Sequence, residues 1–200
     1  MDFPYPFDQT CFITGHRPQS IGNGWDDHPA HEICKRKLRL LILKAMQRGY
    51  LYFIDGMAVG TDIWCAEMIC FDPEIVAQGA KLIAAVPFPG QEKAWKDTKA
   101  VALYRCILEA AHDSYTISLE MNISPQIDRR KWVSIALLQR NRWMVDRASL
   151  GIGLYDGSQN GGTFRAVEYA RKLNRTICTY NPVSKSFERH DTQLSLISPT

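Results

Sequence analysis

The sequence lacks a marked excess of charge of either sign. Its 200 residues include 24 Lys and Arg against 21 Asp and Glu, for a formal net charge of +3. This balance gives no reason to expect nucleic acid as a partner, although it would not repel a phosphorylated small molecule. No apolar run approaches the roughly 18 residues that a membrane span requires. The N-terminal residues Asp2, Pro4 and Pro6 do not resemble the basic start of a signal peptide. We therefore expect a cytoplasmic protein without a membrane partner.

Closely spaced cysteines are also missing. The six cysteines form no C-x-x-C pair, and they do not show the tight spacing of a small secreted disulfide framework. A zinc site needs clustered Cys and His ligands. Most of the six lie in apolar segments, so we expect buried reduced thiols and no metal site.

Two common nucleotide-binding motifs are absent as well. The chain contains neither the G-x-G-x-x-G fingerprint of dinucleotide dehydrogenases nor the spacing of the Walker P-loop. An ordinary NAD-dependent dehydrogenase or NTPase is therefore disfavoured.

Short β-rich apolar runs alternate with longer helical patterns along the chain, which is typical of a parallel sheet covered by helices. The predicted strands are residues 10–14, 50–54, 81–86, 114–119, 150–155 and 176–180. The predicted helices are residues 29–48, 61–71, 91–112, 132–148 and 163–173. We predict one α/β domain over residues 1–200, a Rossmann-like three-layer sandwich with a mostly parallel central sheet. Its core spans about residues 10–182, and 183–200 form a tail.

Three predicted strands end in turns that contain glycine. In a doubly wound sheet the carboxyl ends of the strands form the ligand crevice. Glycine lets a phosphate approach the backbone, and a following helix offers unpaired N–H groups. Gly161, Gly162 and Thr163 fit this arrangement, with Thr163 as a possible helix cap. The alternative is that these glycines form only a flexible turn.

The other two turns bring polar side chains to the same crevice. In the turn from Gly56 to Asp62, the Asp62 carboxylate would repel phosphate, so Asp62 is either structural or an acceptor for ribose hydroxyls. After the first strand, Gly15 is followed by His16 and Arg17. The Arg17 guanidinium suits a phosphate group. His16 is either a titrating group or a hydrogen-bonded bystander.

These turns belong to an ordered set of motifs along the chain. The set consists of Thr14-Gly15-His16-Arg17, Gly56-Met57-Ala58-Val59-Gly60-Thr61-Asp62 with Ala66-Glu67, Pro87-Phe88-Pro89-Gly90-Gln91 with Trp95, Arg140-Asn141-Arg142-Trp143-Met144-Val145-Asp146, and Tyr155-Asp156-Gly157 followed by Gly161-Gly162-Thr163 and Tyr169-Ala170. Over about residues 10–182 the series resembles the YpsA-like branch of the SLOG superfamily. Relatives of that branch include the LOG cytokinin-activating phosphoribohydrolases and the DNA-processing protein DprA.

The resemblance implies a Rossmann-like fold that binds a nucleotide or a nucleotide-derived ligand related to NAD or ADP-ribose. It does not supply a reaction. LOG enzymes place a functional glutamate two or three residues after the threonine of their glycine-rich motif. Arg165 and Ala166 occupy those positions here, and Glu168 lies further along the helix. This departure argues against phosphoribohydrolase activity.

Together, the turns and the resemblance define a candidate site. The predicted ligand- or phosphate-binding residues are Gly15, His16, Arg17, Gly56, Met57, Gly60, Thr61, Asp62, Pro87, Phe88, Arg140, Asn141, Asp156, Gly161, Gly162 and Thr163. If the protein is an enzyme, the candidate catalytic residues are Asp62, Glu67 and Asp156.

The site and the resemblance together suggest three functions. The first is a nucleotide-ligand sensor or regulatory module, with a nucleotide or an ADP-ribose- or NAD-derived ligand and a possible homo-oligomer. The second is a LOG-type hydrolase of the nucleotide N-glycosidic bond. The third is a DprA-like single-stranded DNA binder, which requires a continuous basic groove with exposed aromatic side chains.

Overall fold

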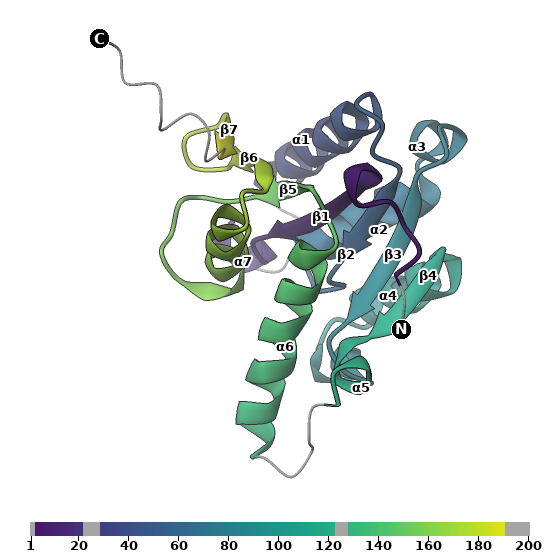
Figure 1. The fold of residues 1–200 in the computed structure, drawn as a ribbon, viewed down its shortest axis with the longest axis vertical. Coiled ribbons are helices and arrows are strands. Elements are labelled where there is room, and N and C mark those ends of the chain that lie inside the picture. The colour runs from purple at the N-terminus through teal and green to yellow at the C-terminus, as the bar shows by residue number, and fades with distance from the viewer. Residues whose placement is uncertain (1–2, 22–28, 123–127, 191–200) are drawn as a thin grey trace.

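The computed structural model describes residues 3–21, 29–122 and 128–190, and shows an α/β fold around one seven-stranded sheet (Figure 1). The strands are β1 (Thr10–Gly15), β2 (Tyr52–Asp55), β3 (Lys81–Val86), β4 (Asp113–Thr116), β5 (Leu150–Leu154), β6 (Thr176–Asn181) and β7 (Ser186–His190). Their order across the sheet is β4-β3-β2-β1-β5-β6-β7, and only the β6–β7 pair is antiparallel. The predicted mostly parallel sheet is confirmed.

Helices cover both faces of this sheet. They are α1 (Pro29–Met46), α2 (Thr61–Phe71), α3 (Pro73–Ala77), α4 (Thr98–Ala110), α5 (Ile117–Glu120), α6 (Arg129–Asp146) and α7 (Gly161–Lys172). Short 3-10 turns occur at η1 (Phe7–Gln9), η2 (Pro18–Ser20) and η3 (Gln91–Ala94). Helices α1, α2 and α4 share one face, whereas α6 and α7 pack together on the other (Figure 1). These layers confirm the predicted three-layer sandwich.

The alternation of side chains along β1 shows why two cores form. Cys11 and Ile13 belong to the core beneath α1 and α2, whereas Phe12 belongs to the core beneath α6 and α7. All three side chains are buried. A parallel strand buried on both faces reads as a continuous apolar run, as this segment does.

Two predicted elements differ in the structure. The helix expected at residues 91–112 is divided into η3 and α4, because the Asp97 side chain accepts hydrogen bonds from the N–H groups of Lys99 and Ala100 and starts a new helix there. The strand expected at 114–119 ends at Thr116, and the chain then turns into α5. Apolar content alone did not separate a strand from a short helix at this point.

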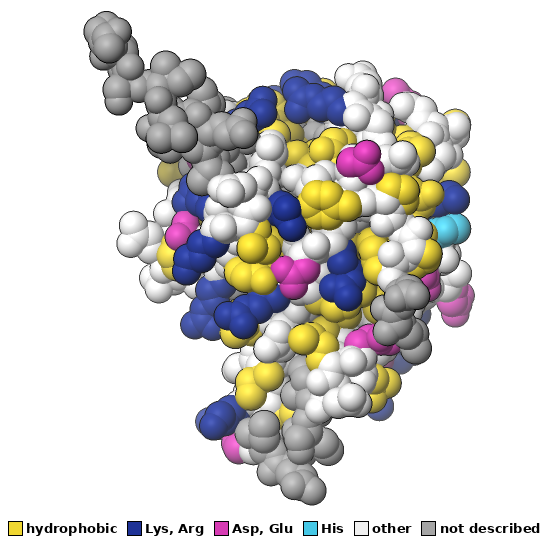
Figure 2. Space-filling view, in the orientation of Figure 1, with side chains coloured by type: hydrophobic (Ala, Val, Ile, Leu, Met, Phe, Trp, Pro, Cys, Tyr) yellow, Lys and Arg dark blue, Asp and Glu magenta, His cyan; other side chains and the backbone are white. Residues whose placement is uncertain are grey.

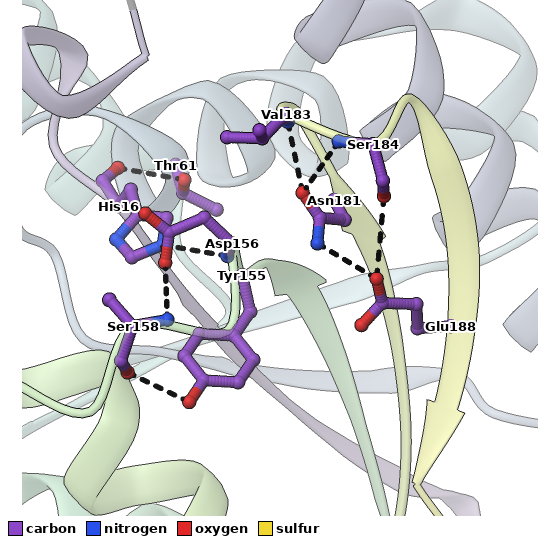
Figure 3. A network of polar contacts seen from close by, with 9 residues as sticks. All are labelled: His16, Thr61, Tyr155, Asp156, Ser158, Asn181, Val183, Ser184 and Glu188. Carbon is purple, nitrogen blue, oxygen red and sulfur yellow. Dashed lines mark hydrogen bonds and ion pairs between the residues drawn. The ribbon is translucent and has the colours of Figure 1, made fainter.

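The prediction that residues 183–200 form a tail is wrong for the part of that segment up to His190. Residues 186–190 form β7, which pairs with β6 as a hairpin. The Asn181 side chain accepts hydrogen bonds from the N–H groups of Val183 and Ser184, and it donates to Glu188 (Figure 3). An asparagine turn of this kind reverses the chain without glycine. Residues 191–200 of the predicted tail lie outside the described residues.

The connections between strands change direction at one point in the sheet. From β1 the chain passes through α1 to β2, whereas from β5 it passes through α7, on the opposite face, to β6. Strands β1 and β5 are neighbours, so the loops at their carboxyl ends diverge to opposite faces. Such a topological switch point is where open α/β sheets bind ligands.

Within the part of the chain that the structure describes, no helix is long and apolar enough to cross a membrane.

Candidate functional site

The three glycine turns lie at one edge of the sheet. Strand β1 lies between β2 and β5 and is parallel to both, so the residues that follow the carboxyl ends of these three strands lie at the same edge of the sheet. Gly15 ends β1, Gly56 follows β2, and Gly162 lies in the first turn of the helix that follows β5. The expectation that these three glycines share an edge is confirmed.

His16 and Asp156 meet across the switch point (Figure 3). The imidazole Nε2 of His16 lies 3.0 Å from the backbone nitrogen of Asp156 and 2.9 Å from its Oδ1 atom. A neutral Nε2 accepts a hydrogen bond from the backbone N–H, whereas a protonated Nε2 donates one to the carboxylate. In either state the pair joins the loop after β1 to the loop after β5, which are 140 residues apart in the sequence.

The Asp156 carboxylate is held in its ionised form. Partial burial raises its pKa, but hydrogen bonds from Ser158 and the nearby His16 outweigh this effect, so the net pKa lies below the ordinary value. The loop is also fixed by Tyr155, whose hydroxyl donates to the carbonyl of Ser158. The candidate site therefore contains one fixed negative charge beside an imidazole.

The β1 turn is also tied to α2. The Thr61 hydroxyl donates to the carbonyl of His16 at 2.9 Å, and the Thr61 backbone N–H donates to the same oxygen. Thr61 is the first residue of α2, after Gly60. One of the N–H groups of this helix terminus is therefore already satisfied by the protein itself.

Arg140 and Asp62 form a buried ion pair beneath the β2 turn. Arg140 Nη1 lies 3.1 Å from Asp62 Oδ2, and each side chain is only 8% exposed. The Ala58 backbone N–H donates to the same Asp62 oxygen. Burial raises the pKa of Asp62, and Arg140 opposes that shift only in part. Because its Oδ2 atom already accepts from two donors, Asp62 has a structural role, and it is poorly placed to act as a general base.

The guanidinium of Arg140 lies directly against Gly56. A Cβ atom at Gly56 would lie 1.1 Å from Arg140 Nη1, which no real contact allows. The close approach of this side chain from α6 therefore favours glycine at this position, because any larger residue would force the guanidinium to move.

Asp55 is a site residue that the sequence analysis missed. It ends β2 and is fully buried, and its Oδ1 atom accepts the backbone N–H of Met57 at 2.6 Å. Burial, and then the charge of Asp62, raise the pKa of Asp55 well above the usual range. The available signal was an acidic residue directly after an apolar strand and directly before Gly56.

The turn before α7 has a different character. Gly161 has a positive φ of 87°, whereas Gly162 is not in that region and its carbonyl accepts a hydrogen bond from the Asn141 side chain. Thr163 is not the cap that the sequence predicts. The helix begins at Gly161, and the N-cap residue Asn160 makes no side-chain cap bond. With no acidic residue in its first turn, α7 offers a more open N-terminus than α2.

Four further predicted residues lie at three different places. Arg17 is exposed at the edge of the sheet, and its charge contributes to lowering the pKa of Asp62. Phe88, after β3, contacts Trp132 of α6 with ring centroids 5.2 Å apart, and the Pro87 carbonyl accepts the N–H of Ser118. Glu67 is half-exposed on α2, and no hydrogen bond or ion pair within the described ranges joins it to the site.

A groove of about 380 Å³ adjoins the α7 turn, between α6 and α7. It is lined by Leu138, Asn141, Arg142, Phe164, Arg165, Ala166, Glu168, Tyr169 and Lys172. Figure 2 shows basic side chains gathered over these two helices. No group of His, Cys, Asp and Glu in the described part of the chain has the arrangement of a metal site.

Comparisons with known proteins agree with this architecture. A model of the YspA SLOG family matches residues 11–184. UPF0398 proteins from Bacillus thuringiensis (strain Al Hakam) and Bacillus cereus (strain AH187) are each 26% identical over 160 residues, covering 80% of this chain and 81% of each relative. A UPF0398 protein of Bacillus cereus (strain B4264) has the same identity and coverage. The family match spans most of the chain and all three glycine turns, and so the chain belongs to the YspA SLOG family.

Proposed function

We propose that this protein binds a nucleotide or a nucleotide-derived ligand of the ADP-ribose class at the switch point, and acts as a sensor or regulatory module. The observation that carries the proposal is the contact of His16 with Asp156 between the loops after β1 and β5. It places an imidazole and a carboxylate where α/β sheets of this topology bind their ligands.

The phosphate end of the ligand belongs at α7. Its first turn has a glycine pair, lacks a side-chain cap and has no acidic residue. The corresponding turn of α2 is occupied by Asp62 and by the contact between Thr61 and the His16 carbonyl. An anion gains from unpaired helical N–H groups only where no carboxylate competes for them.

The polar end of a ribose fits the other side of the crevice. The Asp156 carboxylate is part-exposed and ionised, so it can accept hydrogen bonds from ribose hydroxyls. His16 can donate or accept at the same place, according to its protonation state. Arg17 supplies a positive charge at the open edge of the crevice.

Removal of the Arg17 charge tests the phosphate part of this proposal. We expect Arg17→Ala to weaken the binding of ADP-ribose by roughly 10- to 100-fold, since a hydrogen bond to a charged group contributes about 1.5–3 kcal/mol. The affinity for adenosine, which lacks phosphate, should change little. Isothermal titration calorimetry of both ligands measures the difference.

The matched control is Arg105→Ala, which removes an exposed arginine from α4, outside the residues assigned to the site. It should leave both affinities unchanged. Equal weakening by the two substitutions would mean that net charge alone attracts the ligand. Wild-type protein that binds neither ADP-ribose, NAD nor nucleoside monophosphates would refute the proposed ligand class.

Hydrolysis of the N-glycosidic bond is the second candidate function, and we expect it to be slow or absent. Asp62 is committed to Arg140 and Ala58, and Arg165 and Ala166 stand where LOG enzymes place their glutamate. Chromatography of nucleoside monophosphates after incubation with the protein measures any released base. Release that disappears in Asp156→Asn would show that Asp156 activates water, and the protein would then be an enzyme.

We rank DNA binding third. The groove between α6 and α7 contains Arg142, Arg165 and Lys172, but Glu168 shares it. Three cations beside a carboxylate are few for a protein that must neutralise several phosphates along a strand.

A further inference from the structure

A buried carboxyl group without a cation lies beneath the β2 turn. Asp55 is 0% exposed. Its Oδ1 atom accepts the Met57 N–H, whereas its Oδ2 atom is buried and has no hydrogen-bond partner in the described structure. Arg140, the cation of this cluster, pairs with Asp62 instead. Burial of an ionised carboxylate that lacks a paired cation is strongly unfavourable, so the protonated acid is the favoured form.

The turn that Asp55 contacts has an unusual backbone. Met57 has a φ of 57°, a region that residues with a side chain rarely adopt. Its N–H is held by Asp55, and its carbonyl accepts a hydrogen bond from the buried Gln91 side chain at 3.0 Å. The two bonds fix the peptide groups on both sides of Met57. We expect Met57 to leave this strained backbone conformation when either hydrogen bond is lost.

We propose that Asp55, as a neutral carboxylic acid, is a positioning residue that holds the turn from Gly56 to Gly60 in its binding-competent shape. This proposal rests on the proposed function, because the turn leads to Thr61, which holds the His16 carbonyl beside the His16–Asp156 contact where the ligand is proposed to bind. Asp55 does not touch the ligand, since it is fully buried. It acts through Met57 and through the turn that carries Gly60 and Thr61 to the His16 carbonyl.

The charged and titratable groups around Asp55 come from two helices. From α2, Asp62 raises the Asp55 pKa by repulsion, and the Cys65 and Cys70 thiols interact electrostatically with Asp55. From α6, Arg140 lowers the Asp55 pKa, but less than burial and Asp62 raise it. Because the pKa is raised in the fold, the stability contributed by the protonated form is complete below the ordinary carboxyl pKa. It is lost as pH rises through the folded-state pKa.

Asp55→Asn tests the neutral state, since asparagine resembles the protonated acid and does not ionise. As pH increases from 5 to 9, the melting temperature of wild type should fall below that of Asp55→Asn. At pH 9 the two melting temperatures should differ by at least about 2–4 °C. Asp97→Asn is the matched control, because Asp97 also accepts backbone N–H groups but is exposed. Its melting temperature should keep the pH dependence of wild type.

Hydrogen exchange of the Met57 amide tests the positioning role without any ligand. Asp55→Asn keeps an acceptor for this N–H, so protection should be retained, whereas Asp55→Ala should exchange about tenfold faster. The affinity for ADP-ribose at pH 7 should stay within about twofold of wild type in Asp55→Asn and fall at least about tenfold in Asp55→Ala. If Asp55→Ala does not fold, the Asn variant alone decides.

Two results would overturn the proposal. One is an Asp55→Asn protein that loses Met57 protection as Asp55→Ala does, which would mean that an ionised carboxylate is needed. The other is a difference in melting temperature that does not change with pH. Failure of wild type to bind ADP-ribose, with the exchange and melting results as expected, would refute the ligand class and leave the role of Asp55 supported.

Discussion

Gly56→Ala should destabilise the protein by about 3–5 kcal/mol and abolish the binding of ADP-ribose, because the β2 turn supports the proposed site. The added methyl group would lie 1.1 Å from Arg140 Nη1, so the guanidinium must leave. When the guanidinium leaves, the buried Asp62 carboxylate no longer has a cation beside it. Denaturant unfolding followed by circular dichroism measures the loss, and titration with ADP-ribose measures binding.

Gly162→Val provides the contrast. Gly162 is exposed, and a Cβ atom there would approach only the Asn141 side chain, at 3.6 Å. Its fold should remain nearly as stable as wild type, while a branched side chain beside the α7 terminus obstructs the phosphate. We therefore expect binding to fall far more than stability.

A Gly56→Ala protein as stable as wild type would show that Arg140 moves aside without cost, and the ion pair would lose its structural role.

Arg140→Met should also remove about 3–5 kcal/mol of stability, although methionine retains much of the apolar volume. The cause is the Asp62 charge, which burial already disfavours and which then has no cation beside it. Without Arg140 the Asp62 pKa rises further, so Asp62 takes up a proton more readily in the folded state. The destabilisation should therefore be larger at pH 8 than at pH 4, as urea unfolding at the two pH values would show.

The double variant Arg140→Met with Asp62→Asn is the control for this explanation. It removes both charges, so it should recover part of the lost stability, because coupled partners are not additive. Its destabilisation should also lose most of the pH dependence, because asparagine does not titrate. Arg17→Ala, which removes an exposed charge near Asp62, should affect stability little. If the double variant is no more stable than Arg140→Met, packing around the Arg140 side chain, and not its charge, accounts for the effect.

These expectations divide the candidate site into a supporting part and a binding part. Asp55, Asp62 and Arg140 are buried and determine the shape of the β2 turn. His16 and Asp156 are more accessible and lie at the switch point. Substitutions in the first group that break its ion pair or its hydrogen bond to Met57 should reduce stability and binding together, whereas substitutions in the second group should reduce binding alone.

Much of the fold could be predicted from the sequence, because its signals are local. Buried parallel strands such as β1 and β3 are short apolar runs, and the helices between them repeat their apolar positions at helical spacing. Gly15, Gly56 and Gly162 lie in or after the turns that follow β1, β2 and β5, so a parallel sheet predicts that all three lie at one edge. Elements defined by a single polar side chain were missed. Asp97 divides a predicted helix, and Asn181 starts the β6–β7 hairpin.

The sequence by itself determined the α/β class, the positions of the main strands along the chain and the edge at which the polar turns gather. Only the tertiary structure decided which polar groups become partners. Asp62 and Arg140 are 78 residues apart, and His16 and Asp156 are 140 apart, so no local pattern reports either pair. The tertiary structure also decided that burial and the charge of Asp62 raise the pKa of Asp55, and that the α7 terminus has no side-chain cap while that of α2 is occupied. The physical reason is that the protonation state of a carboxyl group and the availability of an N–H group depend on burial and on neighbouring charges, which packing alone supplies.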